Sequence, residues 1–328
     1  MKAQLHPGRL PPALANLLGA SRQVPRLAAP DITPWRAGNA LPGVWSFDSG
    51  EPGLHLCVVA LTHGNEIAGA ILLDHLLREG LRPARGRLSL VFANLDAFSR
   101  FDADDPTASR FLEEDLNRVW DIATLESPRR SCELRRARAL RPVFDTADVI
   151  LDLHSMLWPS DPLFLVGGPQ ASVQLAMELG EPALVVADQG HQAGRRLIDY
   201  GLFAVPGSGR RGVLLEGGWH WEAETVARMA AATHRMLALT GLVPMPLAGH
   251  ATPRHLARVT RTVTARTAEF TFTQRWRGGV VIPQGGTMIA LDGDEQIRTP
   301  HDDCMLVMPS LVVSAGHTAV RLARWVTA

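Results

Sequence analysis

Cysteine is scarce in this chain: three residues, Cys57, Cys132 and Cys304, are spread over 328 positions. Their number is odd and no two of them form a CxxC pair, so we expect neither a disulfide framework nor a thiolate zinc site. The first 29 residues are broken by four prolines and lack the apolar core and cleavage site of a signal peptide. These features predict a protein of a reducing compartment, and therefore a cytoplasmic one.

Lysine and net charge are also lacking. Lys2 is the only lysine, so nearly all basic residues are arginines, and 33 basic residues balance 33 acidic ones. Without a long basic run, the field that draws a protein to nucleic acid or to an anionic membrane is missing. No apolar run reaches the roughly 18 residues of a transmembrane helix. We therefore expect neither nucleic acid nor a membrane as a partner, and any anion must be recognised locally.

What the chain does contain is an alternation of apolar runs and helical periodicity. With 46% hydrophobic residues it can bury a substantial core. Strands are predicted at 55–61, 88–93, 147–153, 183–187 and 212–215, and helices at 67–77, 133–140, 174–179 and 222–239. Such alternation indicates an α/β fold with a wound sheet.

The composition changes after residue 243. Pro244, Pro246 and Pro253 mark a linker, and the residues that follow form short runs rich in Val, Thr and Ile, separated by glycines. This pattern is typical of a small β domain. We therefore divide the chain into an α/β domain, residues 1–243, and a β domain, residues 244–328, which we expect to shape the entrance of a site on the first.

Residues able to bind a metal stand at the ends of three predicted strands. His63 and Glu66 follow the apolar run that starts at residue 54, His154 follows 147–153, and Glu216 follows 212–215. Open α/β sheets carry their chemistry at the carboxyl ends of the strands. Two imidazoles and one carboxylate are the ligand set of a catalytic zinc ion, and the remaining carboxylate can serve as base. The pattern indicates hydrolysis of an amide or ester.

A charged loop lies in the sequence between the first of these strand ends, which carries His63 and Glu66, and the second, which carries His154. Asn117 and Arg118 in this loop could together hold a carboxylate, because the arginine fork matches that group bidentately. Asp115 could cap a turn instead of serving the site. Asp152 shares a strand face with His154, and we interpret it as structural.

Four segments in order resemble the succinylglutamate desuccinylase/aspartoacylase family, a branch of the zinc carboxypeptidase superfamily. They are Thr62-His63-Gly64-Asn65-Glu66, Asp115-Leu116-Asn117-Arg118, Asp152-Leu153-His154 and Leu215-Glu216-Gly217. Near the carboxyl end, Leu291-Asp292-Gly293 and Asp303-Cys304 look like the family's β domain. The resemblance implies a zinc-carboxypeptidase-like mixed sheet flanked by helices, with a smaller C-terminal β domain.

The resemblance also implies a role for each motif residue. His63, Glu66 and His154 would bind one Zn²⁺ per chain, and Glu216 would act as general base and then as general acid. Co²⁺, Mn²⁺ or Fe²⁺ could occupy the same ligands.

The remaining implied roles concern the charged loop. Arg110 would polarise the scissile carbonyl and stabilise the oxyanion. Asp115 would accept a hydrogen bond from His63, and Asn117 and Arg118 would bind the substrate carboxylate.

Two departures from the family pattern leave the substrate open. Aspartoacylases have a tyrosine near the end of the second domain, whereas here residues 304–309 contain none and Tyr200 is the only tyrosine. They also have an arginine upstream of the catalytic glutamate. The candidates for that arginine are Arg195, Arg196, Arg210 and Arg211.

The predicted function is zinc-dependent deacylation of an N-acyl amino acid or a related small carboxylate-bearing amide. One alternative is a metallocarboxypeptidase acting on small peptides, because a terminal carboxylate would suit the same loop. An alternative of another class is a catalytically silent relative that binds a carboxylate. The predicted partner is the small-molecule substrate, and a homo-oligomer stays open.

Overall fold

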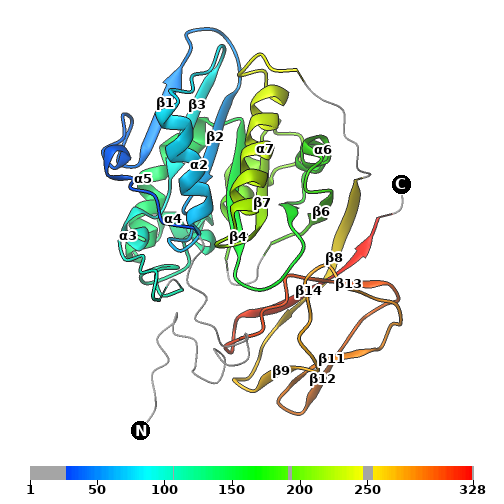
Figure 1. The fold of residues 1–328 in the computed structure, drawn as a ribbon. Coiled ribbons are helices and arrows are strands. Elements are labelled where there is room, and N and C mark those ends of the chain that lie inside the picture. Colours follow the sequence, from blue (N-terminus) through cyan, green and yellow to red (C-terminus); the bar gives the residue numbers. More distant parts are fainter. Residues whose placement is uncertain (1–26, 106, 191–193, 247–253, 327–328) are drawn as a thin grey trace.

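The computed structural model describes residues 27–105, 107–190, 194–246 and 254–326, and Figure 1 gives the course of the chain. The strands are β1 (Val44–Asp48), β2 (His55–Ala60), β3 (Arg87–Phe92), β4 (Val149–Met156), β5 (Leu163–Val166), β6 (Leu184–Ala187), β7 (Arg211–Trp219), β8 (His255–Thr264), β9 (Phe270–Phe272), β10 (Val281–Ile282), β11 (Met288–Asp292), β12 (Glu295–Arg298), β13 (Cys304–Val307) and β14 (Thr318–Trp325). The α-helices are α2 (Ile67–Arg78), α3 (Leu95–Phe98), α4 (Ile122–Glu126), α5 (Cys132–Thr146), α6 (Gln170–Leu179) and α7 (Ala223–Leu239). Short 3-10 helices are η1 (Thr33–Trp35), η2 (Leu116–Arg118), η3 (Leu197–Asp199) and η4 (Gly201–Ala204).

A mixed sheet forms the centre of the fold. Its order is β1-β3-β2-β4-β7-β5-β6-β8-β14-β13-β10. The four strands β3, β2, β4 and β7 run parallel, whereas β5 pairs antiparallel with β7. Because the parallel strands are covered on both faces, their sequences read as continuous apolar runs, and β2 and β4 are buried throughout. The predicted α/β mixed sheet flanked by helices is confirmed.

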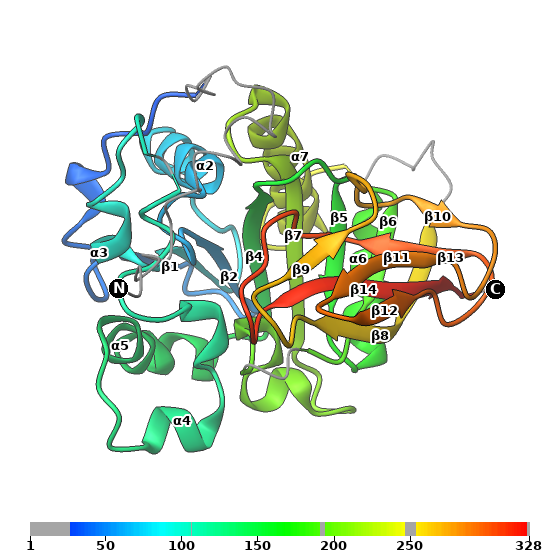
Figure 2. The ribbon, with the colours of Figure 1, turned by 90° about the horizontal axis from the view of Figure 1, so that it is seen from below.

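The two faces of the sheet carry separate hydrophobic cores. Alternate residues of β2 point to opposite sides, so Leu56 and Val58 join one core while Cys57 and Val59 join the other. Helices α2, α6 and α7 cover the first core, and α5 covers the second. Figure 2 shows α2 and α7 on one side of the sheet and α4 and α5 on the other. The sheet is therefore held rigidly between two layers of helices, and its strands can position side chains accurately.

Several predicted elements differ from the observed ones in their extent. Helix α5 continues through Pro142 to Thr146, beyond the predicted end at residue 140, and its last turn buries Phe144 in the second core. Strands β4 and β7 also run past the predicted ends at His154 and Glu216. Backbone pairing between these two strands continues to the pair Met156 and Trp219, with a register shift after His154. The apolar pattern of one strand cannot predict this extension, because the extension depends on hydrogen bonds to the partner strand.

The C-terminal region continues the central sheet. Strand β8 pairs in parallel with β6 and antiparallel with β14, which leads on to β13 and β10. A three-stranded sheet, β12-β11-β9, completes this antiparallel region, which lies beside β8 and β14 in both views. The predicted C-terminal β region is confirmed. Its boundary at residue 244 stays a prediction, and most of the expected linker, residues 247–253, lies outside the described residues.

None of the helices in the described part of the chain combines the length and the apolar character needed to cross a membrane.

Candidate metal centre

The loop between β2 and α2 carries the first two candidate ligands. Leu61 leaves the strand with φ 57°, a left-handed conformation that few residues other than glycine adopt, and it turns the chain out of the sheet. Gly64 sits where no side chain fits, because a Cβ there would lie 2.5 Å from both the Phe98 nitrogen and the Ser109 carbonyl oxygen. This close packing holds His63 and Glu66 at the carboxyl edge of the sheet.

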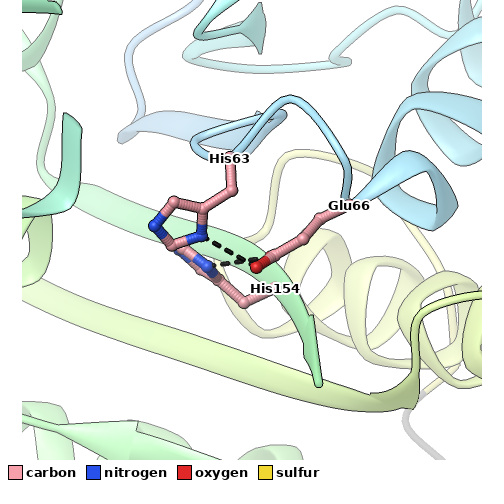
Figure 3. Close-up of side chains that lie close together, drawn as sticks. All are labelled: His63, Glu66 and His154. Atoms are coloured by element: carbon pink, nitrogen blue, oxygen red, sulfur yellow. Dashed lines mark hydrogen bonds and ion pairs between the residues drawn. The ribbon is translucent and has the colours of Figure 1, made fainter. Parts of the chain in front are cut away.

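The structure brings His63, Glu66 and His154 together. His63 Nδ1 lies 2.8 Å from Glu66 Oε1, and His154 Nδ1 lies 3.0 Å from Glu66 Oε2. Figure 3 shows both imidazole rings turned toward this carboxylate. The three ligand atoms lie within 4.8 Å of one another, and each of the three residues is at most 3% exposed. A buried set of two imidazole nitrogens and one carboxylate fits Zn²⁺.

The outer nitrogen of each histidine contacts a carboxylate. His63 Nε2 lies 2.9 Å from Asp115 Oδ1, and His154 Nε2 lies 2.8 Å from Asp152 Oδ2. Asp152 also accepts a hydrogen bond from Thr62 Oγ1 at 2.9 Å. If each Nε2 carries the proton and donates it to its carboxylate, both Nδ1 atoms keep a lone pair toward the centre. These contacts therefore prepare both rings to bind a cation.

The charges of the cluster are strongly coupled. Burial alone would raise the pKa of Glu66, but the adjacent His63 and His154 hold that pKa well below its ordinary value. Burial would lower the pKa of His154, but Asp152 and Glu66 raise it well above its ordinary value. The buried carboxylate thus keeps a positive charge beside it, and a divalent cation can take over this role.

Arg110 reaches the same carboxylate from the charged loop. Its guanidinium lies 3.3 Å from Glu66 Oε1 and 3.5 Å from Asp115 Oδ2. The Arg110 carbonyl accepts a hydrogen bond from Gly64 nitrogen at 3.1 Å, so the loop is attached directly beside His63. Arg110 therefore stands next to the candidate ligands, where its charge can act on a substrate oxygen.

Glu216 lies beside the ligands on the neighbouring strand, opposite His154 in the β4–β7 register. Its Oε2 atom is buried and has no hydrogen-bond partner among the described residues. Burial raises the pKa of Glu216 to about 8; His154 lowers this pKa, Glu66 raises it, and Arg110 lowers it. A carboxyl group whose pKa lies near neutral pH is suited to accept a proton and to return it.

The short turn η2, which carries Asn117 and Arg118, begins directly after Asp115 at the site. Asp115 Oδ1 accepts the Asn117 amide at 2.8 Å in addition to His63, so it caps the turn and also contacts the candidate ligand. Asn117 Nδ2 lies 3.5 Å from His154 Nε2, and its Oδ1 accepts from the Leu197 amide at 2.8 Å. Of the two predicted substrate-binding residues, Asn117 therefore reaches the candidate metal centre, and Arg118 follows it in the same turn.

Arg118 stands in a region rich in positive charge. Its pKa is lowered to about 10 by burial, against the effect of Asp115, while Arg321, Arg110 and Arg196 lower it further. The guanidinium donates to the Asn117 carbonyl at 2.7 Å. An anion bound here would relieve the repulsion among these arginines.

The structure excludes two of the four arginines proposed upstream of Glu216. Arg211 begins β7 and pairs with Val149 at the start of β4, whereas Glu216 pairs with His154. Five residues of extended strand separate them by about 16 Å. Arg210 and Arg211 therefore lie toward the opposite edge of the sheet from the site.

The other two arginines are held in ion pairs. Arg195 Nε lies 3.3 Å from Asp121 at the surface. Arg196 is buried, with Nε 2.6 Å from Asp199 and a terminal nitrogen 3.3 Å from Asp188. Arg196 supports the segment that contacts Asn117, and its own charge is already balanced by two carboxylates.

Two groups at the site were not predicted as members of it. Arg321 on β14 extends from the C-terminal region to Asp188, with Nε 2.8 Å from Oδ2. His220 Nδ1 lies 2.7 Å from Ser155 Oγ, and the Ser155 amide donates to Glu66 at 3.0 Å. No sequence signal marks Arg321, because its partner is 133 positions away.

Asp152, which the sequence analysis leaves outside the catalytic set, contacts the candidate ligand His154. The signal for this role was its position, because residues two apart on a strand share a face.

The sequence of the chain is similar to those of known proteins. The family "Succinylglutamate desuccinylase/Aspartoacylase catalytic domain" matches residues 52–240. The aspartoacylase of Xenopus tropicalis is 31% identical over 115 residues, which are 32% of this chain and 34% of that protein. The succinylglutamate desuccinylase of Pseudomonas fluorescens (strain Pf0-1) is 34% identical over 114 residues, 32% of each chain. The match thus spans about a third of the length of these curated relatives.

Solved structures share the fold over a larger part of the chain. Succinylglutamate desuccinylase from Vibrio cholerae superposes with a TM-score of 0.69 at 20% identity, covering 88% of this chain and 86% of the other. Murine aminoacylase 3 superposes with a TM-score of 0.61 at 22% identity, covering 84% of this chain and 96% of the other. Because the family match covers more than half of the residues, the chain belongs to the succinylglutamate desuccinylase/aspartoacylase family.

Proposed function

We propose that this protein is a zinc-dependent amidohydrolase that removes the acyl group of an N-acyl amino acid or a related small carboxylate-bearing amide. The observation that carries the proposal is the convergence of His63, Glu66 and His154 beside the buried Glu216. Membership of a family whose relatives include proteins named aspartoacylase and succinylglutamate desuccinylase supports the same chemistry.

In this proposal, His63, Glu66 and His154 would hold Zn²⁺, which would supply Lewis acidity for the hydrolysis of the amide. Glu216 takes a proton from a water molecule while the oxygen of that water attacks the carbonyl carbon. Arg110 stabilises the negative charge that develops on the carbonyl oxygen. As the C–N bond breaks, Glu216 returns the proton to the leaving nitrogen, and the products are a carboxylic acid and a free amine.

Substrate orientation is assigned to the positive region around Arg118. A substrate carboxylate bound by Arg118 and Asn117 would fix the amide over the metal centre, because charge-assisted contacts position a carboxylate well. Arg321 adds positive charge from the C-terminal region. This arrangement favours a small anionic substrate.

The cellular setting also belongs to this proposal. All three cysteines are free thiols, as expected in a reducing compartment, and we propose a cytoplasmic location. Whether the protein forms a homo-oligomer stays a prediction.

Metal content and a substrate panel test the function directly. The purified protein should contain about one zinc per chain, and a chelator should abolish its activity. The panel comprises N-acetyl, N-succinyl and longer N-acyl amino acids with matched unblocked dipeptides, and release of the free amino acid is measured. Cleavage of the dipeptides alone would favour a carboxypeptidase, and metal binding without any turnover would favour a silent relative.

The role of Glu216 is tested by Glu216→Gln. The variant should retain zinc, because Glu216 is not among the candidate ligands, while kcat falls by about 10²–10⁴-fold with loss of the proton shuttle. Metal analysis and steady-state kinetics with a panel substrate provide the two measurements. Near-normal turnover would assign the base to another group.

Glu216 should also make the stability of the chelator-treated protein depend on pH. Its folded pKa of about 8 exceeds the ordinary value of 4.5, so folding favours its protonated form. This stabilisation is fully present below about pH 4.5 and is lost as the pH rises through about 8. Urea unfolding across this range should show a steeper fall for the wild type than for Glu216→Gln.

Glu224→Gln is the control for this experiment, because Glu224 is exposed in the first turn of α7. Its stability profile should follow the wild type. His154 titrates in all three proteins, so the difference between profiles is the quantity to compare. Parallel profiles for the wild type and Glu216→Gln would contradict the raised pKa.

Arg118→Ala tests carboxylate binding. Loss of one charge-assisted contact, about 1.5–3 kcal/mol, should raise KM by about 10–100-fold while kcat changes little. Arg195→Ala is the matched control, because Arg195 forms a surface ion pair with Asp121. An unchanged KM in Arg118→Ala would remove this residue from substrate binding.

A further inference from the structure

A buried carboxylate outside the proposed reaction holds the charged loop in place. Glu133, in the first turn of α5, is fully buried. Its two oxygens accept four hydrogen bonds: from the amides of Leu112 at 2.7 Å, Glu113 at 3.2 Å and Glu114 at 3.3 Å, and from Asn94 Nδ2 at 3.2 Å. We call residues 112–114 the anchored segment. One side chain thus satisfies three consecutive backbone donors that have no strand or helix to pair with.

The anchored segment in turn binds the start of α5. The Glu113 carboxylate accepts from the Cys132 amide, and Glu114 Oε1 lies 2.5 Å from Ser131 Oγ. Ser131 caps the helix through the Leu134 amide at 2.9 Å. The loop therefore supplies a carboxylate to a backbone amide of the helix, and the helix supplies one to the amides of the loop. These reciprocal hydrogen bonds fix the position of the loop relative to the helix.

The two ends of the anchored segment lead directly to the candidate metal centre. Arg110 precedes it and contacts Glu66, and Asp115 follows it and contacts His63. Asn94 is the fourth donor to Glu133, and its backbone amide donates a hydrogen bond to the Leu61 carbonyl at 2.8 Å. The same carboxylate is therefore linked to the loop that presents Asp115 and to the turn that presents His63.

The hydrogen bonds at this position require two acceptor oxygens on one side chain. Four donors converge on two oxygens, and a neutral amide would place its own N–H groups against some of them. Burial of a charge is unfavourable unless it is compensated by such hydrogen bonds. A group of this kind is therefore suited to hold a loop of otherwise irregular backbone in a single conformation.

We propose that Glu133 is a positioning residue that fixes the Asp115–His63 contact and the placement of Arg110, and thereby sets the metal affinity of the centre. The inference rests on the proposed function for the identity of the metal. Carboxylates that orient metal-binding histidines contribute about 10–100-fold to metal affinity. Glu133 acts one step further out, through the anchored segment and Asp115.

The test is a double-mutant cycle on zinc affinity, measured by competition with a chromophoric chelator. Glu133→Gln should weaken zinc binding by about tenfold, and Asp115→Asn by about 10–100-fold. Because Glu133 acts through Asp115, the double variant should bind zinc no more weakly than Asp115→Asn. Glu224→Gln, also in the first turn of a helix but exposed, is the control and should bind like the wild type.

Amide hydrogen exchange provides a second readout that needs neither metal nor substrate. Glu133→Gln should raise exchange across residues 110–118 and leave α2 and β4 protected as in the wild type. Should Glu133→Gln not fold, Glu133→Asp keeps the charge on a shorter side chain and should give the same effects at smaller size. If the wild type binds no zinc, the proposed function fails, while raised exchange at 110–118 still supports the anchoring.

Three outcomes would overturn the inference. Unchanged zinc affinity in Glu133→Gln would remove it from metal positioning. Additive losses in the double variant would mean that Glu133 does not act through Asp115. Exchange raised evenly through the protein would assign Glu133 to general stability alone.

Discussion

The site depends on one buried carboxylate. Glu66 lies between two imidazoles, 2.8 Å from His63 and 3.0 Å from His154, where water cannot solvate its charge. An isolated charge is very unfavourable at such a position, so the surrounding protein must supply positive charge beside it. The histidines do so when protonated, and a divalent cation does so more effectively. The same electrostatic requirement therefore explains why the pKa of Glu66 is held low and that of His154 is raised, and why the cluster is suited to a metal.

Each member of the cluster is held by a group farther out. Asp115 and Asp152 bind the outer nitrogens of the two histidines, and Glu133 binds the loop that presents Asp115. All three of these supports are carboxylates that accept hydrogen bonds from surrounding groups. This arrangement restricts the side chains of the cluster to one geometry, which is the electrostatic preorganisation that the proposed reaction would need.

The C-terminal region takes part in this arrangement through charge. Strand β8 joins β6 in the central sheet, and Arg321 on β14 reaches Asp188, which also binds Arg196. Because Arg321 lowers the pKa of both Arg118 and Glu216, the positive charge around Arg118 comes partly from residues late in the chain. The region identified in the sequence as a separate β domain therefore belongs electrostatically to the site.

The sequence by itself determined the α/β class, the parallel strands and the candidate ligands. Buried strands read as apolar runs, and His63, Glu66 and His154 stand within a few residues of the ends of such runs. Only the tertiary structure decided that β4 and β7 extend past the site, that Arg210 and Arg211 lie away from it, and which groups support the ligands. Contacts such as Glu133 with residues 112–114, or Arg321 with Asp188, join segments far apart in the chain. Such contacts leave no periodic trace in the sequence, because they depend on how packed elements meet and not on local conformation.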